Sequence, residues 1–342
     1  MKASALETAD RSDAEAVKEP LGNPNAKRLL ADDLRGMCIE AGAYDAGFVE
    51  IEREAFDKER EGMLRVYPRT RTVVSVVQIM NRENVRSPAR YLSAKEFNYT
   101  LDDLNGITRA ILRRLNAMGV RGVVMNGAFP MDTGRYPGKT WDVSHKIVAV
   151  EAGMGRMGLN RLVIHPRCGN FIELASILID AELDRYDAPL AESPCIDCRL
   201  CVAACPVGAV HADGSFDLLT CMTHAYRDNA RGFLEWVEAV GASGGDVAAY
   251  RERFRDSETA SLWQSLMYGM DYKCGYCMAV CPAGEDVKPE YLGRKQDFMK
   301  EVFQPLKDRV EPVYAMAGSE AEARIGKNPN KEFRPAGLVG AR

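Results

Sequence analysis

The chain has 342 residues, 27% of them charged, and a formal net charge of −4. This balance makes a nucleic-acid partner unlikely without excluding one, and no apolar run reaches the ~20 residues that a membrane-spanning helix needs. The length accommodates two domains. Residues 1–25 are polar, contain two prolines and lack the apolar core of a signal peptide, so they predict a flexible N-terminal arm.

Hydrophobic periodicity predicts a layered α/β domain over residues 26–190. Apolar residues at helical spacing predict helices, and short apolar runs rich in β-branched residues predict strands. The predicted helices cover 26–42, 93–118 and 143–152, and the predicted strands cover 47–51, 72–79, 120–125, 161–165 and 171–179. Glycines, prolines and single aromatic residues between 126 and 140 predict a long loop, and loops of this length inside a domain are usually functional or disordered.

The second half of the chain is rich in cysteine and predicts a separate iron–sulfur domain over 191–286. A helical insert over 230–270 interrupts this domain. The tail over 287–342 shows one further amphipathic helix, and its end beyond residue 326 reads as irregular because it is rich in proline and lysine.

Seven of the ten cysteines fall into two runs with ferredoxin-like spacing. A Cys-x2-Cys-x2-Cys loop reaches three corners of a [4Fe–4S] cluster, and in bacterial two-cluster ferredoxins the cysteine that follows, before a proline, binds the other cluster. The second set is one thiolate short, and Cys221 completes it. We therefore predict two clusters, the first bound by Cys195, Cys198, Cys201 and Cys281, and the second bound by Cys205, Cys221, Cys274 and Cys277.

Zinc sites and disulfides are less consistent with this cysteine pattern. Structural zinc sites favour paired Cys-x2-Cys hairpins, which explain the longer first run poorly. Disulfides need an oxidising compartment, whereas ten reduced cysteines point to the cytoplasm. The two remaining cysteines, Cys38 and Cys168, lie in separate apolar segments and read as ordinary buried thiols.

Three glycines at 153, 155 and 158 match the dinucleotide-binding fingerprint by their letters alone. That fingerprint must follow a strand and open a helix. Here the preceding residues 144–152 predict a helix, and residues 162–165 downstream predict a strand. We therefore interpret the glycines as positions where the backbone passes close to a flat ligand or a cluster.

The segments around these glycines resemble a known family. Ser144-His-Lys146, then Glu151-Ala-Gly-Met-Gly-Arg-Met-Gly-Leu-Asn160 and Leu162-Val-Ile-His-Pro166, together with the eight cysteines, are similar to the cobalamin-dependent family of epoxyqueuosine reductases and reductive dehalogenases. The resemblance covers roughly residues 26–289. It implies an α+β protein in which a nitroreductase-like α/β corrinoid-binding domain precedes a bacterial-type two-[4Fe–4S] ferredoxin domain.

The resemblance also implies the cofactors and partners. It implies two [4Fe–4S] clusters and a cobalamin in the base-off form, and none of the four histidines lies in an Asp-x-His-x-x-Gly motif that would replace the lower base. It further implies a small-molecule substrate and an external low-potential electron donor of the ferredoxin or flavodoxin type. The expected cofactor-binding residues are His145, Gly153, Gly155, Gly158 and Asn160.

The proton donor is the least defined part of the site. The epoxyqueuosine branch of the family has an aspartate in an Asp-Ser-Ala-Pro motif, but Lys139 occupies that position here and Asp142 is the nearest carboxylate. The dehalogenase branch uses a tyrosine beside a lysine or arginine, for which Tyr91, Tyr99 and Tyr136 are the candidates. A nearby cation would make such a phenol a better acid. The expected catalytic residues are Asp142, Tyr99, Tyr136 and Lys146.

The main prediction is a reductive dehalogenase-like enzyme that uses cobalt(I) and electrons relayed by two clusters. The alternative from the same family is an epoxyqueuosine reductase-like enzyme of tRNA queuosine synthesis. A corrinoid-free ferredoxin-type electron-transfer protein and a flavin-bearing iron–sulfur reductase would also account for the cysteine pattern. The sequence leaves the substrate, the electron donor and the oligomeric state open.

Overall fold

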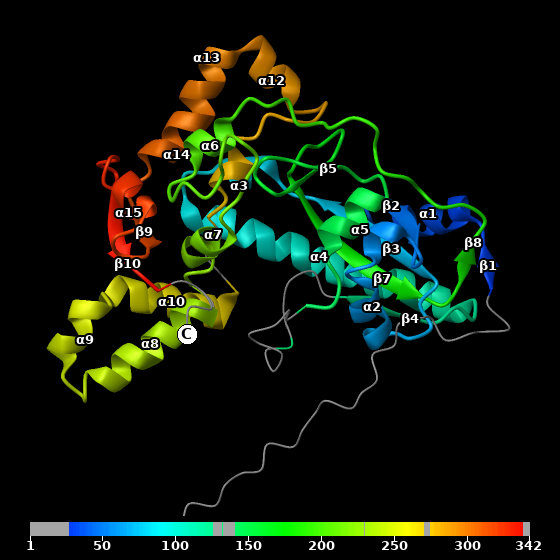
Figure 1. The fold of residues 1–342 in the computed structure, drawn as a ribbon, viewed down its shortest axis with the longest axis horizontal. Helices are drawn as coiled ribbons and strands as arrows, with labels where there is room; N and C mark the ends of the chain where they lie inside the picture. The colour runs from blue at the N-terminus through cyan, green and yellow to red at the C-terminus, as the bar shows by residue number, and fades with distance from the viewer. Residues whose placement is uncertain (1–26, 126–131, 133–140, 229, 270–273, 338–342) are drawn as a thin grey trace, which may run out of the picture.

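The computed structural model describes residues 27–125, 132, 141–228, 230–269 and 274–337. The predicted N-terminal arm, most of the long loop and Tyr136 lie outside the described residues. Figure 1 shows two parts side by side, one built around a sheet and the other built mainly of helices. Within the described residues, no helix is long and apolar enough to cross a membrane.

A four-stranded antiparallel sheet forms the centre of the first part. Its strands are ordered β2-β3-β7-β4, with β2 at Asp45–Glu50, β3 at Thr72–Ile79, β7 at Ile172–Ile179 and β4 at Gly122–Met125. Strand β3 has the bounds that the sequence predicts, because its mainly apolar and β-branched residues are buried on both faces of the sheet. A mixed α and β fold, as predicted, is therefore present.

Helices cover both faces of this sheet. On one face, α1 (Ala31–Glu40) and α4 (Arg90–Ala117) pack against alternate residues of β3 such as Val74 and Val76. On the other face, α2 (Arg60–Val66) and α5 (His145–Glu151) pack against Val73 and Val77. The alternation follows the two-residue period of a strand. The sequence missed α2 and the short α3 (Arg82–Arg86), both of which are less than two full turns long.

Smaller elements complete the first part. The short 3₁₀ helix η1 spans Glu54–Phe56, β1 (Arg28–Leu29) pairs in parallel with β8 (Glu182–Leu183), and β5 (Arg156–Met157) pairs antiparallel with β6 (Val163–Ile164). The predicted first helix is therefore shorter than expected, since its first residues form β1 instead.

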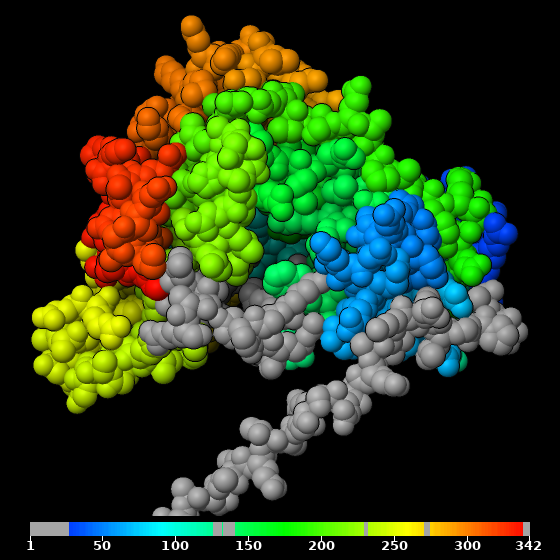
Figure 2. All heavy atoms as spheres, viewed as in Figure 1, coloured from blue at the N-terminus to red at the C-terminus, as the bar shows by residue number. Residues whose placement is uncertain are grey.

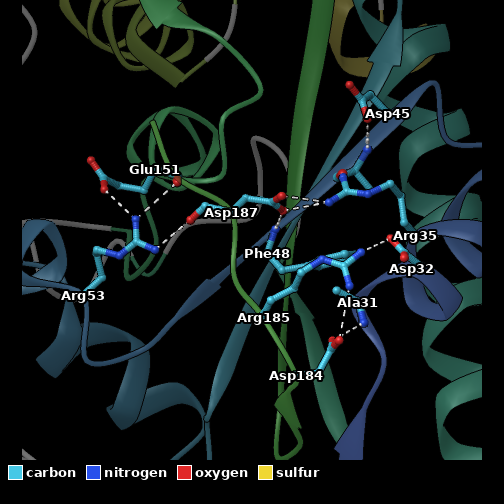
Figure 3. A network of polar contacts seen from close by, with 11 residues as sticks. Ala31, Asp32, Arg35, Asp45, Phe48, Arg53, Glu151, Asp184, Arg185 and Asp187 are labelled. Carbon is cyan, nitrogen blue, oxygen red and sulfur yellow. Dashed lines mark hydrogen bonds and ion pairs between the residues drawn. The ribbon is translucent and has the colours of Figure 1, made fainter. Parts of the chain in front are cut away.

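Polar contacts anchor the segment that leaves the first part (Figure 3). The carboxylate of Asp187 accepts hydrogen bonds from Arg35 at 2.8 and 3.0 Å and from the backbone N–H of Phe48 at 2.7 Å. Arg53 donates to the backbone carbonyl of Asp187 at 2.8 Å and pairs with Glu151, at the end of α5, at 3.3 Å. One arginine thus fixes both the exit of the chain and the C-terminal end of α5.

The second part contains the cysteine runs and the helical insert. The cysteine-bearing helices are α6 (Leu200–Ala204), α7 (Leu218–Ala225) and α11 (Tyr276–Ala279). The insert forms α8 (Ala230–Ala242), α9 (Val247–Arg253) and α10 (Asp256–Tyr268), within the predicted range 230–270. These helices project from one end of the molecule (Figure 1).

The C-terminal segment is more structured than the sequence predicts. It forms α12 (Lys288–Gly293), α13 (Lys295–Phe298), the π-helix η3 (Met299–Phe303), α14 (Gln304–Asp308), β9 (Glu311–Ala315), α15 (Glu320–Ile325) and β10 (Lys331–Pro335). The prediction of one helix and an irregular end is wrong, because β10 pairs in parallel with β9 along five residues. This pairing brings together distant positions and leaves no local signal.

Candidate functional site

The seven cysteines of the two runs and Cys221 gather into two groups. All ten cysteines of the chain are free thiols. The first group lines one pocket, together with Asn160, Ile164 and Pro282. Its cysteines, Cys195, Cys198, Cys201 and Cys281, are those that spacing assigns to one cluster. Cys281 comes from the second run and meets three cysteines of the first, so the two runs cross in space.

In the second group, as in the first, one cysteine is buried and three are partly exposed. Burial raises the pKa of the Cys274 and Cys277 thiols far above the ordinary range, and the Cys205 and Cys221 thiols raise both pKa values further. Burial likewise raises the pKa of Cys221 to about 12, with Cys205 as the next cause. Mutual electrostatic influence of this kind requires proximity. The second group therefore consists of Cys205, Cys221, Cys274 and Cys277.

Backbone N–H groups point at several of these sulfur atoms. Ala209 donates its N–H to the sulfur of Cys205 at 3.2 Å. Backbone hydrogen bonds lower the pKa values of four other thiols against the raising effect of burial, namely Cys198, Cys201, Cys274 and Cys281. Such donors favour the thiolate over the thiol. They are also one of the means by which a protein adjusts the potential of an iron–sulfur cluster.

Among the described residues, no three His, Cys, Asp or Glu side chains are arranged to bind one and the same metal ion. In a [4Fe–4S] cluster, each of four thiolates binds its own iron atom. Two crossed groups of four thiols, largely buried and several of them with N–H donors, are a donor set that fits two such clusters.

The two parts of the molecule meet at backbone level next to Cys281. Gly284 has φ +101°, and a β-carbon there would lie 2.3 Å from the backbone nitrogen of Gly169. Glu285 and Asp286 donate their N–H groups to the carbonyls of Pro166 and Arg167 at 2.8 and 2.9 Å. The loop after the second cysteine run is thus joined to the sheet part by backbone contacts that leave no room for a side chain.

Lys146 connects the sheet part to the second cysteine group. It lies in the first turn of α5, and its ammonium donates to the carbonyl of Arg161 at 2.9 Å. Burial lowers the pKa of Lys146, whereas Glu173, Cys277 and Cys221 raise it in that order. The sequence-predicted Lys146 is therefore within electrostatic reach of two of the predicted cluster ligands.

The neighbouring predicted residues contact the sheet and the cysteine loop. The imidazole Nδ1 of His145 lies 2.8 Å from the hydroxyl of Ser176 on β7, which fixes the ring against the sheet. Asn160 is buried and donates its amide to the carbonyl of Cys277 at 3.1 Å. Asn160 therefore supports the loop of the second group while lining the pocket of the first.

The three glycines make room for this chain's own atoms. A β-carbon at Gly153 would lie 2.7 Å from the carbonyl oxygen of Ala188, and at Gly155 it would lie 2.5 Å from that of Ile164. At Gly158 it would meet the Ile164 side chain at 2.6 Å. They follow the helix α5 rather than a strand, so the context of a dinucleotide site is missing here. A cofactor contact for these glycines stays a prediction.

The predicted proton donors are not brought together. Asp142 lies against α2, where its carboxylate pairs with Arg65 at 3.3 Å. Tyr99 is on α4, with its side chain 56% exposed and the ammonium of Lys95 4.7 Å from the ring centre. A role for Tyr99 as a proton donor stays a prediction. Tyr136 and Lys139 lie outside the described residues.

A hollow separates the two parts on the face seen in Figure 2. Its walls are the yellow-green region of α7 and the blue region of α2, with the teal α4 visible at the bottom. Helix α7 carries Cys221, and α4 carries Tyr99.

The fold and the site define a mixed α and β protein with two crossed groups of four thiols beside its sheet. No protein-family model matches the chain. The chain is 27% identical over 186 residues to the epoxyqueuosine reductase of Staphylococcus aureus, covering 54% of this chain and 40% of that protein. It is 36% identical over 97 residues to the epoxyqueuosine reductase of Cyclobacterium marinum, covering 26% and 31%. The predicted family relationship is confirmed, and the chain is a relative of the epoxyqueuosine reductases.

Solved structures show weaker similarity. An epoxyqueuosine reductase from Streptococcus thermophilus matches with a TM-score of 0.45 and 18% identity over 80% of this chain and 74% of that one. A reductive dehalogenase matches with a TM-score of 0.43 and 16% identity over 56% and 27%. The chain spans well under half the length of the curated relatives that it matches.

Proposed function

We propose that this protein is an iron–sulfur reductase that works with a corrinoid, and that its reaction is of the epoxyqueuosine reductase type. The observation that carries the proposal is the second group of four thiols, placed against Lys146 of the sheet part. The curated relatives are named epoxyqueuosine reductases. They favour this alternative over the dehalogenase-like reaction that the sequence predicts first.

The two thiol groups would each hold one [4Fe–4S] cluster. Such clusters supply electrons one at a time at low potential. The first group lines a pocket to which the exposed Arg199 also contributes. Electrons from an external ferredoxin- or flavodoxin-type donor would therefore enter at the first cluster and leave from the second.

Lys146 is the chain's best-placed proton donor for a reaction next to the second cluster. Lys146 is exposed at the surface, but neighbouring protein atoms partly desolvate its ammonium and lower its pKa, so that it gives up a proton more readily than a fully solvated lysine does. The carbonyl of Arg161 orients the ammonium through the 2.9 Å hydrogen bond. His145, held by Ser176, is fixed in the same turn of α5. Proton supply and electron supply thus converge on one face.

The corrinoid belongs to the proposal through the family relationship, and the hollow in Figure 2 supports it. When bound, a corrinoid would supply a low-valent cobalt that attacks a strained or halogenated carbon. The described elements that border the hollow are α7 and α2, with α4 at its bottom. Because burial excludes water from the second thiol group, the reduced cofactor would be protected there.

Reduction of an epoxide to an alkene consumes two electrons and two protons and releases one water molecule. The external donor would supply the two electrons one at a time through the two clusters. Lys146 would donate one proton, and solvent would supply the other and reprotonate Lys146 afterwards. The curated relatives take their name from epoxyqueuosine, an epoxide on a nucleoside. We therefore propose an epoxide on a nucleoside as the substrate class.

The test is turnover by anaerobically reconstituted protein with cobalamin and a chemical reductant. We expect loss of the epoxide oxygen from an epoxyqueuosine-containing stem loop, detected by mass spectrometry of the nucleosides. A brominated phenol serves as the competing substrate in a parallel reaction. Bromide release without any change in the stem loop would overturn the epoxyqueuosine-type proposal in favour of the dehalogenase-like one.

A further inference from the structure

A buried group of charged residues in the C-terminal segment surrounds Tyr276, which lies inside the Cys274-x2-Cys277 loop. Its members are Arg309, Glu311 and Lys331. Their side chains are 9%, 4% and 3% exposed. Buried charges of this kind are costly unless they are paired and hydrogen-bonded. Three of them around one tyrosine therefore call for a functional explanation.

The contacts of Lys331 are directed at the cysteine loop. Its ammonium donates to the hydroxyl of Tyr276 and to the carbonyl of Arg309, both at 2.5 Å, and lies 3.4 Å from the carboxylate of Glu311. The Tyr276 hydroxyl in turn donates to Glu311. Lys331 is the first residue of β10, so the strand that the sequence failed to predict delivers this charge.

Both cations also lie against the ring of Tyr276. The guanidinium carbon of Arg309 is 4.5 Å from the ring centre, and the ammonium of Lys331 is 4.8 Å from it. The Tyr276 ring is itself buried, with 2% of its surface exposed. Tyr276 lies two residues after Cys274 and one before Cys277, and the Cys274 thiol is among the groups that raise the pKa of Lys331.

The same C-terminal segment touches the other cysteine run. Arg324 of α15 donates to the carbonyl of Cys205 at 2.9 Å and to that of Val202 at 2.9 Å. Val313 and Ile325 pack in one apolar cluster with Cys205. The segment therefore contacts the backbone of one ligand of the second group and the loop that bears two others. Its charges act in a region from which water is largely excluded.

We propose that Lys331 is a positioning residue that holds a buried positive charge against the second cluster and thereby sets its reduction potential. The inference rests on the proposed function only in assuming two clusters. A cluster gains negative charge when it is reduced, so a nearby desolvated cation stabilises the reduced form and makes the potential less negative. The neighbouring carboxylate of Glu311 acts in the opposite direction.

The experiment is an EPR-monitored redox titration of anaerobically reconstituted full-length protein. We expect two midpoint potentials in the unmodified protein. Lys331→Met makes one of them more negative and leaves the other unchanged, and Lys331→Arg, which keeps the charge, returns it toward the original value. Glu311→Gln shifts the same midpoint in the less negative direction. Lys327→Met, at an exposed position of the same segment, serves as the matched control and moves neither.

Midpoint potentials that shift in opposite directions in Lys331→Met and Glu311→Gln distinguish an electrostatic role from loosening of the loop. Loosening of the loop would shift the midpoint potential in the same direction in both variants. If Lys331→Met fails to fold, Glu311→Gln and Lys331→Arg decide the question. Unchanged midpoints in the folded variants, or shifts of the same sign, would overturn the inference. Iron and sulfide contents sufficient for two clusters, measured on the same samples, show that such a failure leaves the two-cluster proposal intact.

Discussion

Gly284 provides a direct test of how the second cysteine run is joined to the sheet part. Replacement by alanine places a β-carbon where the backbone nitrogen of Gly169 lies at 2.3 Å and the carbonyl oxygen of Arg167 at 2.6 Å. Both neighbours are backbone atoms, so no side chain can rotate away. The glycine also has φ +101°, a conformation that alanine rarely adopts. Gly284→Ala must therefore separate the two segments.

The expected cost follows from these contacts. A residue with a side chain in a left-handed conformation costs about 1–2 kcal/mol. Loss of the two backbone hydrogen bonds that Glu285 and Asp286 make to Pro166 and Arg167 costs about 1 kcal/mol each. The total of about 3–4 kcal/mol corresponds to a fall in the apparent unfolding midpoint of about 5–10 °C for a domain of this size.

The assay is thermal unfolding of the anaerobically reconstituted protein, followed by circular dichroism and by the visible absorption of the clusters. We expect Gly284→Ala to lower the unfolding midpoint. The visible absorption of the clusters should be lost at a lower temperature than the circular dichroism signal, because Cys281 precedes the altered loop by three residues. Gly36→Ala is the matched control, since a β-carbon there meets nothing within 4 Å on helix α1. It should stabilise by about 0.5–1 kcal/mol. Equal midpoints for Gly284→Ala and the unmodified protein would refute the close backbone contact.

Three further predictions concern single side chains. Cys281→Ser removes one cluster's worth of iron and its spectroscopic signal, whereas Cys168→Ser, a buried thiol outside both groups, leaves the iron content unchanged. Burial lowers the pKa of His224 to about 4, so the contribution of the neutral imidazole to stability is complete above pH 6.5 and is lost as the pH falls toward 4, by about 3 kcal/mol. The free energy of unfolding in urea should therefore decrease less over this pH range in His224→Gln than in the unmodified protein or in the exposed-site control His211→Gln. Equal pH profiles would contradict the assignment. Lys146→Met lowers turnover roughly 100-fold or more at unchanged cluster content if Lys146 supplies the proton, whereas unchanged turnover would exclude that role.

The sequence predicts the parts of this molecule that depend on local patterns. The strand β3 is rich in valine and is found with the expected bounds. The cysteine spacing predicts the composition of both thiol groups, because loop geometry limits which thiolates can share a cluster. The helical insert follows from periodicity in the same way.

The features that the sequence does not reveal depend on distant contacts. Lys331 reads as a surface lysine in an irregular tail, yet it is buried because it contacts Tyr276, 55 positions earlier. Strand β10 exists because β9 pairs with it, and neither has a strong strand pattern. The approach of Lys146 to Cys221 likewise depends on how the two parts meet. The pairing of Asp142 with Arg65 of the unpredicted helix α2 has the same origin.

The central claim is that two crossed groups of four thiols hold two [4Fe–4S] clusters beside the sheet part. Mössbauer spectroscopy of anaerobically prepared, iron-57-labelled protein, with sulfide analysis of the same sample, tests this claim most directly. We predict equal amounts of iron and sulfide, sufficient for two clusters per chain, with the spectrum of [4Fe–4S] centres alone. Zinc bound without sulfide, or iron sufficient for only one cluster in protein with all eight cysteines intact, would contradict it.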